Sequence, residues 1–223
     1  MASFFLKPNH YKNIYFSNMT SRKNNDITAV ILAGGKSVRM GTDKSLLMLS
    51  GKTLIERAIS LCKKYFGRVL ISTNNSENYE FTGLECVADI HPSLGPISGI
   101  HSGLINSTTR KIFIYSADLI FNDERLLETM IKHSSEKQII LPTVDEIPQY
   151  TFGIYLKSVL PEIEKMILER EDYKPTPRQL IKKVEAALID FNKCIYFEGD
   201  KFINLNTPAD YERAKLIFEK GNN

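Results

Sequence analysis

Short, continuously apolar runs alternate along this chain with segments of helical periodicity, and this alternation constrains the fold more than any other feature. Residues 27–34 (ITAVILAG) and 111–118 (KIFIYSAD) are typical of strands buried on both faces. Between such runs, one helical stripe is formed by Leu54, Ile55, Ala58, Ile59, Leu61 and Cys62. The alternation predicts an α/β fold, a single-domain, three-layer αβα arrangement around a Rossmann-like, mostly parallel sheet.

The remaining elements follow the same rhythm. Further strands are expected at 68–74, 84–89, 138–144, 149–156, 186–191 and 201–206, and helices at 97–107, 123–134, 161–169, 176–184 and 207–220. The chain of 223 residues is long enough for one core, and it contains no internal repeat. Residues 1–26 differ in composition from the rest, so we expect an N-terminal extension at 1–26 and one domain at 27–219.

Charge and cysteine content exclude several classes of protein. The net charge of +3 is too balanced to favour nucleic acid or a membrane as partner. No run of about 18 apolar residues predicts a membrane span. The three cysteines, Cys62, Cys86 and Cys194, form no disulfide pattern and are typical of reduced thiols in a cytoplasmic protein.

The loop after the first strand, LAGGKSVRMGTDKS at 32–45, is suited to phosphate. It is not a P-loop, because Leu46 occupies the position where GKT at 51–53 would require a glycine, and it contains no GxGxxG. The remaining pattern is G-G-x-x-x-R-M-G-x-x-K, in which paired glycines let backbone N–H groups approach an anion. Arg39 and Lys44 supply cations, although two glycines alone are equally typical of a plain turn with solvated charges.

Polar residues follow several predicted strands at their carboxyl ends. They are Gly34, Gly35, Asn74, Asp89 and Asp118. In open α/β sheets ligands bind beyond these ends, so the five residues are expected to line one cleft.

Five motifs resemble those of the nucleotidyltransferases, and most closely those of the molybdenum cofactor guanylyltransferases, and they occur in the same order along the chain. The loop LAGGKSVRMGTDK resembles the family signature, and FIYSAD ends at Asp118, where the family has its metal-binding aspartate. The other similar stretches are DIHPSLGPISGIHSGL at 89–104, PQYTFGIYLKSVLPEI at 148–163 and FINLNTPADYERA at 202–214. The resemblance covers residues 27–219 and implies a fold of the nucleotide-diphospho-sugar transferase type.

The resemblance implies a Mg²⁺-dependent enzyme that transfers GMP from GTP to the phosphate of molybdopterin and releases pyrophosphate. Gly35 favours guanine, because relatives that use CTP typically have LAAG at this turn. Other cofactor-biosynthesis proteins and recipient molybdoenzymes are the implied protein partners. The residues implied to bind the nucleotide are Leu32, Ala33, Gly34, Gly35, Lys44, Asn74, Asp89, Gly95, Pro96, Asp118, Asn204 and Asn206.

Nucleotidyl transfer depends on positioning and charge neutralisation, which assigns the charged residues to separate tasks. Arg39 is expected on the departing β- and γ-phosphates, Lys44 near the α-phosphate, and Asp118 on Mg²⁺. Asn204 and Asn206 are expected near the acceptor or metal-bound waters.

Each of these residues also has a purely structural interpretation. Arg39 and Lys44 could be solvated charges, Asp118 a helix cap, and Asp89 the first residue of an Asx turn. Asn206 could serve only the turn into the last helix.

Two histidines and the sequence after Asp118 have no part in these assignments. His91 and His101 lack metal-ligand spacing and are expected at the surface or the edge of the cleft. After Asp118 the sequence LIFND departs from the Thr/Met-Pro usual in the family. Two alternatives therefore stay open: the same reaction with CTP or another phosphorylated acceptor, and a non-catalytic nucleotide-binding paralogue.

Overall fold

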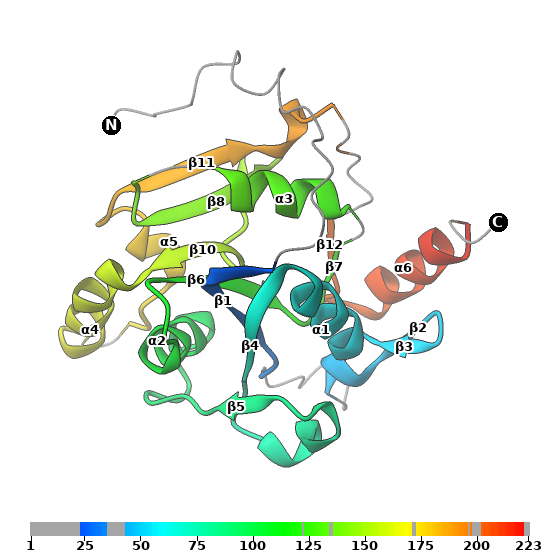
Figure 1. Cartoon of the computed structure of the whole chain (residues 1–223), viewed down its shortest axis with the longest axis horizontal. Coiled ribbons are helices and arrows are strands. Elements are labelled where there is room, and N and C mark those ends of the chain that lie inside the picture. Colours follow the sequence, from blue (N-terminus) through cyan, green and yellow to red (C-terminus); the bar gives the residue numbers. More distant parts are fainter. Residues whose placement is uncertain are drawn as a thin grey trace.

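A twisted sheet forms the centre of the molecule (Figure 1). The computed structural model describes residues 23–34, 43–121, 123–133, 136–170, 173–195, 197 and 202–220. The order of strands across the sheet is β11 (Ala186–Asp190), β8 (Ile139–Val144), β10 (Phe152–Leu156), β6 (Lys111–Ser116), β1 (Asn24–Leu32), β4 (Phe66–Ser72) and β5 (Glu85–Val87). The short strand β9 (Ile147–Pro148) pairs with β8.

Most neighbouring strands run parallel, as the alternating pattern predicts. The pairs β6–β1, β1–β4, β4–β5 and β11–β8 are all parallel. Strand β10 runs antiparallel to both of its neighbours, β6 and β8, and β9 runs antiparallel to β8. Strand β1 lies between β4 and β6, so the loop after β1 leaves from the middle of the parallel half of the sheet.

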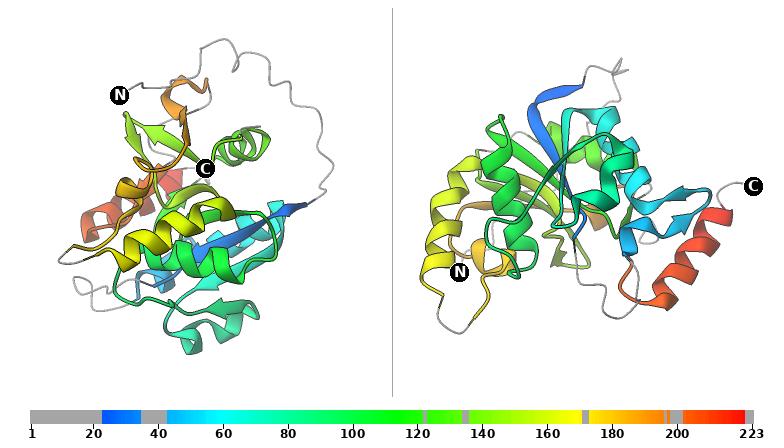
Figure 2. Two further views of the ribbon diagram at one scale, coloured as in Figure 1. Left: turned by 90° about the vertical axis from the view of Figure 1, so that its left-hand side faces the viewer. Right: turned by 90° about the horizontal axis from the view of Figure 1, so that it is seen from below.

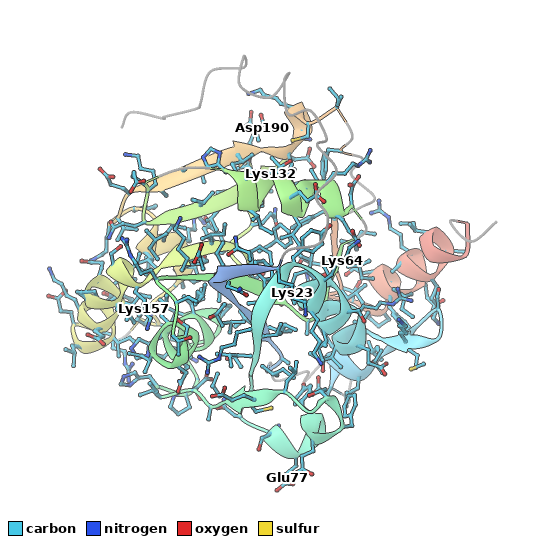
Figure 3. The ribbon with its side chains drawn as sticks, in the orientation of Figure 1. Lys23, Lys64, Glu77, Lys132, Lys157 and Asp190 are labelled. Atoms are coloured by element: carbon cyan, nitrogen blue, oxygen red, sulfur yellow. The ribbon has the colours of Figure 1, made fainter. Side chains whose placement is uncertain are left out.

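Helices cover both faces of this sheet and complete the three layers (Figure 2). One face packs against α1 (Leu54–Tyr65) and α3 (Glu124–Lys132). The opposite face packs against α2 (Pro96–Asn106), α4 (Leu160–Leu168) and α5 (Pro177–Leu180). The predicted stripe of α1 is buried except for Leu61, which is half-buried. Charged side chains such as Lys64 and Glu77, labelled in Figure 3, are exposed.

A smaller cluster stands beside the main sheet and holds the end of the described chain. Hairpin β2 (Met48–Leu49) and β3 (Lys52–Thr53) packs there with the pair β7 (Leu119–Phe121) and β12 (Phe202–Asn204) and with α6 (Pro208–Lys220). Its buried side chains are Leu49, Leu54, Ile120, Ile203, Leu205 and Ala214. This cluster brings the chain around residue 205 next to the end of β6.

Some predictions of element bounds and of side-chain exposure are wrong. The predicted helix at 176–184 is α-helical only from Pro177 to Leu180 and continues as turns. The expectation that His101 lies at the surface or the cleft edge is wrong: it is only 3% exposed, because it packs between His91 and Glu164 of α4. Strand β1 begins at Asn24, three residues before the predicted strand at 27–34. Residues 1–22 of the expected N-terminal extension lie outside the described part of the chain.

None of the helices in the described part of the chain has the length and apolar character needed to cross a bilayer.

Candidate functional site

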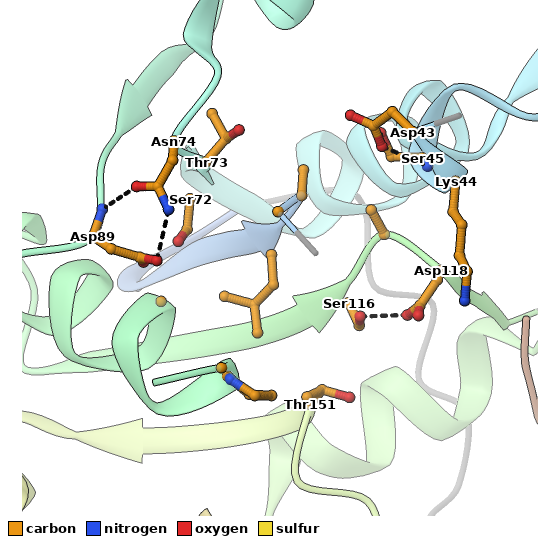
Figure 4. Close-up of a pocket in the computed structure, with 17 residues that line it drawn as sticks. Asp43, Lys44, Ser45, Ser72, Thr73, Asn74, Asp89, Ser116, Asp118 and Thr151 are labelled. Carbon is orange, nitrogen blue, oxygen red and sulfur yellow. Dashed lines mark hydrogen bonds between the residues drawn. The ribbon is translucent and has the colours of Figure 1, made fainter. Parts of the chain in front are cut away.

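The carboxyl ends of the three central strands lie level with one another. Leu32 is in register with Ser72 on one side and with Ser116 on the other. The ladder continues one step further, since Ala33 donates its backbone N–H to the Ser72 carbonyl oxygen over 2.9 Å and Ala117 donates to that of Leu32 over 3.0 Å. The chains then separate, and a cleft opens beyond this edge of the sheet (Figure 4).

Most of the predicted site residues lie in this cleft. Those that line it are Leu32, Ala33, Gly34, Lys44, Asn74, Asp89, Gly95, Pro96 and Asp118. The expectation that the strand ends share one cleft is therefore confirmed for Gly34, Asn74, Asp89 and Asp118. Gly35 and Arg39 lie outside the described residues.

Asn74 and Asp89 are joined by two reciprocal hydrogen bonds at one end of the cleft (Figure 4). The Asn74 Nδ2 donates to Asp89 Oδ2 over 2.8 Å, and the Asp89 backbone N–H donates to Asn74 Oδ1 over 2.9 Å. The amide of Asn74 thus fixes the orientation of the Asp89 carboxylate across the gap between the ends of β4 and β5. One carboxylate oxygen, Oδ1, is left for a further contact.

The amino terminus of α2 forms the wall next to this pair. Gly95 is the N-cap residue, and its φ of 71° is in the region that favours glycine. Pro96 occupies the first helical turn, where its missing N–H costs no hydrogen bond. A helix amino terminus carries a partial positive charge, so this wall favours an anionic or polar ligand.

Lys44 and Asp118 meet at the other end of the cleft through the backbone of Leu205. The Lys44 Nζ donates to the Leu205 carbonyl oxygen over 2.9 Å and to that of Asn206 over 3.4 Å. The Leu205 N–H in turn donates to the Asp118 carbonyl oxygen over 2.9 Å. The segment predicted to act through the side chains of Asn204 and Asn206 therefore contacts Lys44 through its backbone, and neither asparagine is among the described residues that line the cleft.

The Asp118 carboxylate accepts a hydrogen bond from the Ser116 hydroxyl group and faces the cleft (Figure 4). The side chain is half-buried, and β7, formed by the unusual sequence after Asp118, pairs with β12 without removing Asp118 from the cleft. Asp118 therefore lines the cleft even though the sequence that follows it departs from the family pattern.

Sequence reasoning missed Asp43, Ser45 and Tyr79, which are joined beside the loop. The Tyr79 hydroxyl lies 2.6 Å from Asp43 Oδ2, 2.8 Å from Ser45 Oγ and 3.1 Å from the Ala33 carbonyl oxygen. Burial and the neighbouring Asp43 raise the pKa of Tyr79, so its hydroxyl stays protonated at neutral pH. Asp43 belongs to the recognised loop motif, whereas no local signal marks Tyr79.

His101 lies behind the cleft wall rather than in the cleft. In the described structure neither ring nitrogen has a hydrogen-bond partner, and Nε2 is 3.6 Å from the Glu164 carboxylate. Burial lowers the pKa of His101, and His91, whose ring centre is 5.4 Å away, acts in the same direction. The ring is therefore neutral and belongs to the packing of α2.

The cleft lies where the central strands end at the same level, beside a helix amino terminus that attracts anions, and it contains both a lysine and a carboxylate. These features are typical of α/β proteins that bind phosphorylated ligands at this edge of a parallel sheet. Residues 29–187 match the family model of the MobA-like NTP transferase domain. The chain belongs to the MobA-like NTP transferase family.

Curated relatives match over most of their length. A probable molybdenum cofactor guanylyltransferase of Natranaerobius thermophilus is 31% identical over 203 residues, which cover 87% of this chain and 98% of the relative. The molybdenum cofactor guanylyltransferase of Vibrio vulnificus is 34% identical over 184 residues, which cover 81% and 91%.

A solved structure confirms the fold. The molybdopterin-guanine dinucleotide biosynthesis protein A of Archaeoglobus fulgidus superimposes with a TM-score of 0.73 at 24% identity and covers 86% of this chain and 99% of its own. The inositol-1-phosphate CTP transferase of T. maritima has the same fold, with a TM-score of 0.66 at 16% identity. The fold alone therefore does not select the base or the acceptor.

Proposed function

We propose that this protein transfers GMP from GTP to the phosphate of molybdopterin, forming the guanine dinucleotide cofactor and pyrophosphate. The main support for this proposal is the arrangement of the cleft. Lys44 and Asp118 lie at one end of it, and Asn74 and Asp89 lie at the other end. The names of the curated relatives support transfer of a guanylyl group to the molybdenum cofactor.

The polarity of the cleft suits an extended nucleotide. Asp89 and Asn74 offer acceptors and donors to the ribose or the base, and the backbone around Ala33 and Gly34 approaches the phosphates. Lys44 is held by neutral carbonyl oxygens, whereas an anionic phosphate oxygen is a stronger acceptor for an ammonium group. A bound nucleotide can therefore compete with these two backbone contacts of Lys44.

Asp118 fits a Mg²⁺ ion that arrives with the nucleotide. Among the described residues no group of three or more histidine, cysteine, aspartate or glutamate side chains could hold a metal by itself. Mg²⁺ usually binds through one or two carboxylates together with substrate phosphates and water, which matches a single aspartate facing the cleft. When bound, the ion would neutralise phosphate charge. Asp43 is a poorer candidate, because both its carboxylate oxygens already accept hydrogen bonds from Ser45 or Tyr79.

The reaction needs little acid–base help from the protein. An oxygen of the acceptor phosphate, already ionised at neutral pH, forms a bond to the α-phosphorus of GTP while the bond from that phosphorus to the bridging oxygen breaks. Pyrophosphate leaves with the electron pair. Lys44 stabilises the charge that develops at the α-phosphate, and Arg39 is proposed to hold the departing phosphates.

Two other functions are separated from this one by experiment. Calorimetry with GTP and CTP tests the base, and tighter binding of CTP would refute the guanine assignment. Purified protein supplied with GTP, Mg²⁺ and molybdopterin should release pyrophosphate only when the acceptor is present. Binding of GTP without any release would instead identify a non-catalytic nucleotide-binding paralogue.

The proposed setting is the cytoplasm. Cys62, Cys86 and Cys194 are reduced cysteines in the described structure, which is consistent with a reducing compartment. Cofactor-biosynthesis proteins and recipient molybdoenzymes are the proposed protein partners.

A further inference from the structure

The hydroxyl group of Tyr79 lies between the two described ends of the loop at 32–45, which we call the nucleotide loop. Tyr79 lies in the 3₁₀ segment η3 (Ser76–Thr82), which begins shortly after Asn74 at the end of β4. Its side chain is fully buried and packs into the core between the sheet and α1. The ring is therefore fixed, and only its hydroxyl group reaches the edge of the cleft.

The hydroxyl group contacts both sides of the loop. The Ala33 carbonyl oxygen, where β1 ends, is 3.1 Å away. Asp43 Oδ2, where the described chain resumes, is 2.6 Å away, and Ser45 Oγ is 2.8 Å away. One hydroxyl carries one proton, so Tyr79 donates either to the Asp43 carboxylate, the nearest acceptor, or to the Ala33 carbonyl, while Ser45 can donate to Tyr79 or to Asp43.

Lys44 stands between the two residues that Tyr79 contacts on the far side of the loop. Asp43 also accepts the backbone N–H of Ser45 over 3.0 Å and thereby caps the short 3₁₀ turn η2 (Lys44–Leu46). The position of the Lys44 backbone is thus set by Asp43, Ser45 and, through both, Tyr79. On the other side, Ala33 precedes Gly34, whose backbone lines the cleft.

We propose that Tyr79 is a positioning residue that joins the two ends of the nucleotide loop and so sets the place of Lys44 relative to the end of β1. The inference rests on the proposed function, because its consequence is stronger binding of a nucleoside triphosphate. Fixing Ala33 and the backbone of Lys44 relative to one another before a ligand binds lowers the conformational entropy that binding costs.

The test compares Tyr79→Phe with Tyr65→Phe. Tyr65 also donates to a carboxylate, that of Glu124 over 2.8 Å, but it lies between α1 and α3, away from the cleft. In each variant, NMR hydrogen exchange monitors the backbone amides of Ala33 and Ser45, which are hydrogen-bonded to Ser72 and to Asp43. Calorimetry measures the dissociation constants of GTP and guanosine, and thermal denaturation measures overall stability.

Loss of a hydrogen bond to a charged group predicts that Tyr79→Phe accelerates exchange at both amides and weakens GTP binding about tenfold. Binding of guanosine should weaken about threefold at most, because guanosine lacks the α-phosphate beside which Lys44 is proposed to lie. Tyr65→Phe should change thermal stability without changing either measurement at the loop.

Unchanged exchange at Ala33 and Ser45 would overturn the inference, as would an equal loss of GTP and guanosine affinity that tracks only the thermal stability. If the wild-type protein bound no nucleoside triphosphate, the proposed function would be refuted. The exchange rates would then still decide whether Tyr79 joins the two ends of the loop.

Discussion

The substitution Gly99→Ala should displace side chains that line the cleft and so weaken the binding of GTP. Gly99 is on the face of α2 that packs against the ends of β1 and β4, and a Cβ atom there would lie 2.7 Å from Leu32 Cδ2 and 2.8 Å from Ser72 Oγ. Ordinary carbon contacts are about 3.5–4.0 Å, so these side chains must move by about 0.8 Å. Both line the cleft. Overpacking costs about 1–3 kcal/mol, and the higher helix propensity of alanine returns about 1 kcal/mol.

Gly103, one turn further along α2, provides the matched control. A Cβ atom there would lie 2.9 Å from Val30 Cγ1 and 3.0 Å from Cγ2, and Val30 is not among the described residues that line the cleft. Gly99→Ala and Gly103→Ala should therefore each lower stability by about 0–2 kcal/mol. Only Gly99→Ala should weaken GTP binding, by about tenfold or 1.4 kcal/mol. Calorimetry and thermal denaturation measure the two effects, and equal GTP affinities in the two variants would refute the reasoning.

Three further predictions concern other parts of the molecule. Lys44→Ala should reduce pyrophosphate release by about 100-fold or more while the thermal midpoint stays close to wild type, and unchanged turnover would refute the role of Lys44. His101→Leu should reduce acid sensitivity. Because burial holds the pKa of His101 below 6.5, the unfolded chain binds more protons near pH 6, so wild-type stability falls as the pH drops below about 6.5. Denaturant titrations at pH 7.5 and 5.5 should show a smaller loss in the variant. Gly153→Ala would place a Cβ atom 2.8 Å from the Ile140 carbonyl oxygen and should lower the thermal midpoint by about 5 °C or more.

The cleft was predictable because its residues come directly after parallel strands. In such a sheet all carboxyl ends share one edge, so Asn74, Asp89 and Asp118 could be grouped without knowledge of the strand order. The hydrophobic period likewise located α1, and the fold class could be inferred from the alternation of strands and helices.

Features that depend on contacts distant in sequence could not be predicted. The hydrophobic run of β10 fits a buried strand of either direction, so nothing local indicates that Phe152–Leu156 runs antiparallel to its neighbours. Strands β7 and β12 are too short to show a period, and their pairing sets the backbone of Leu205 beside Lys44. Tyr79 is 46 residues from Ala33 in sequence, in a segment without periodicity.

The proposed reaction is the transfer of GMP from GTP to molybdopterin. Its most direct test is a turnover assay that supplies each of the four nucleoside triphosphates in turn, with Mg²⁺ and molybdopterin, and measures pyrophosphate and the dinucleotide product. We expect equal amounts of pyrophosphate and guanine dinucleotide with GTP, and far less product with the other three. Product from CTP in preference to GTP, or no product from any of the four, would contradict it.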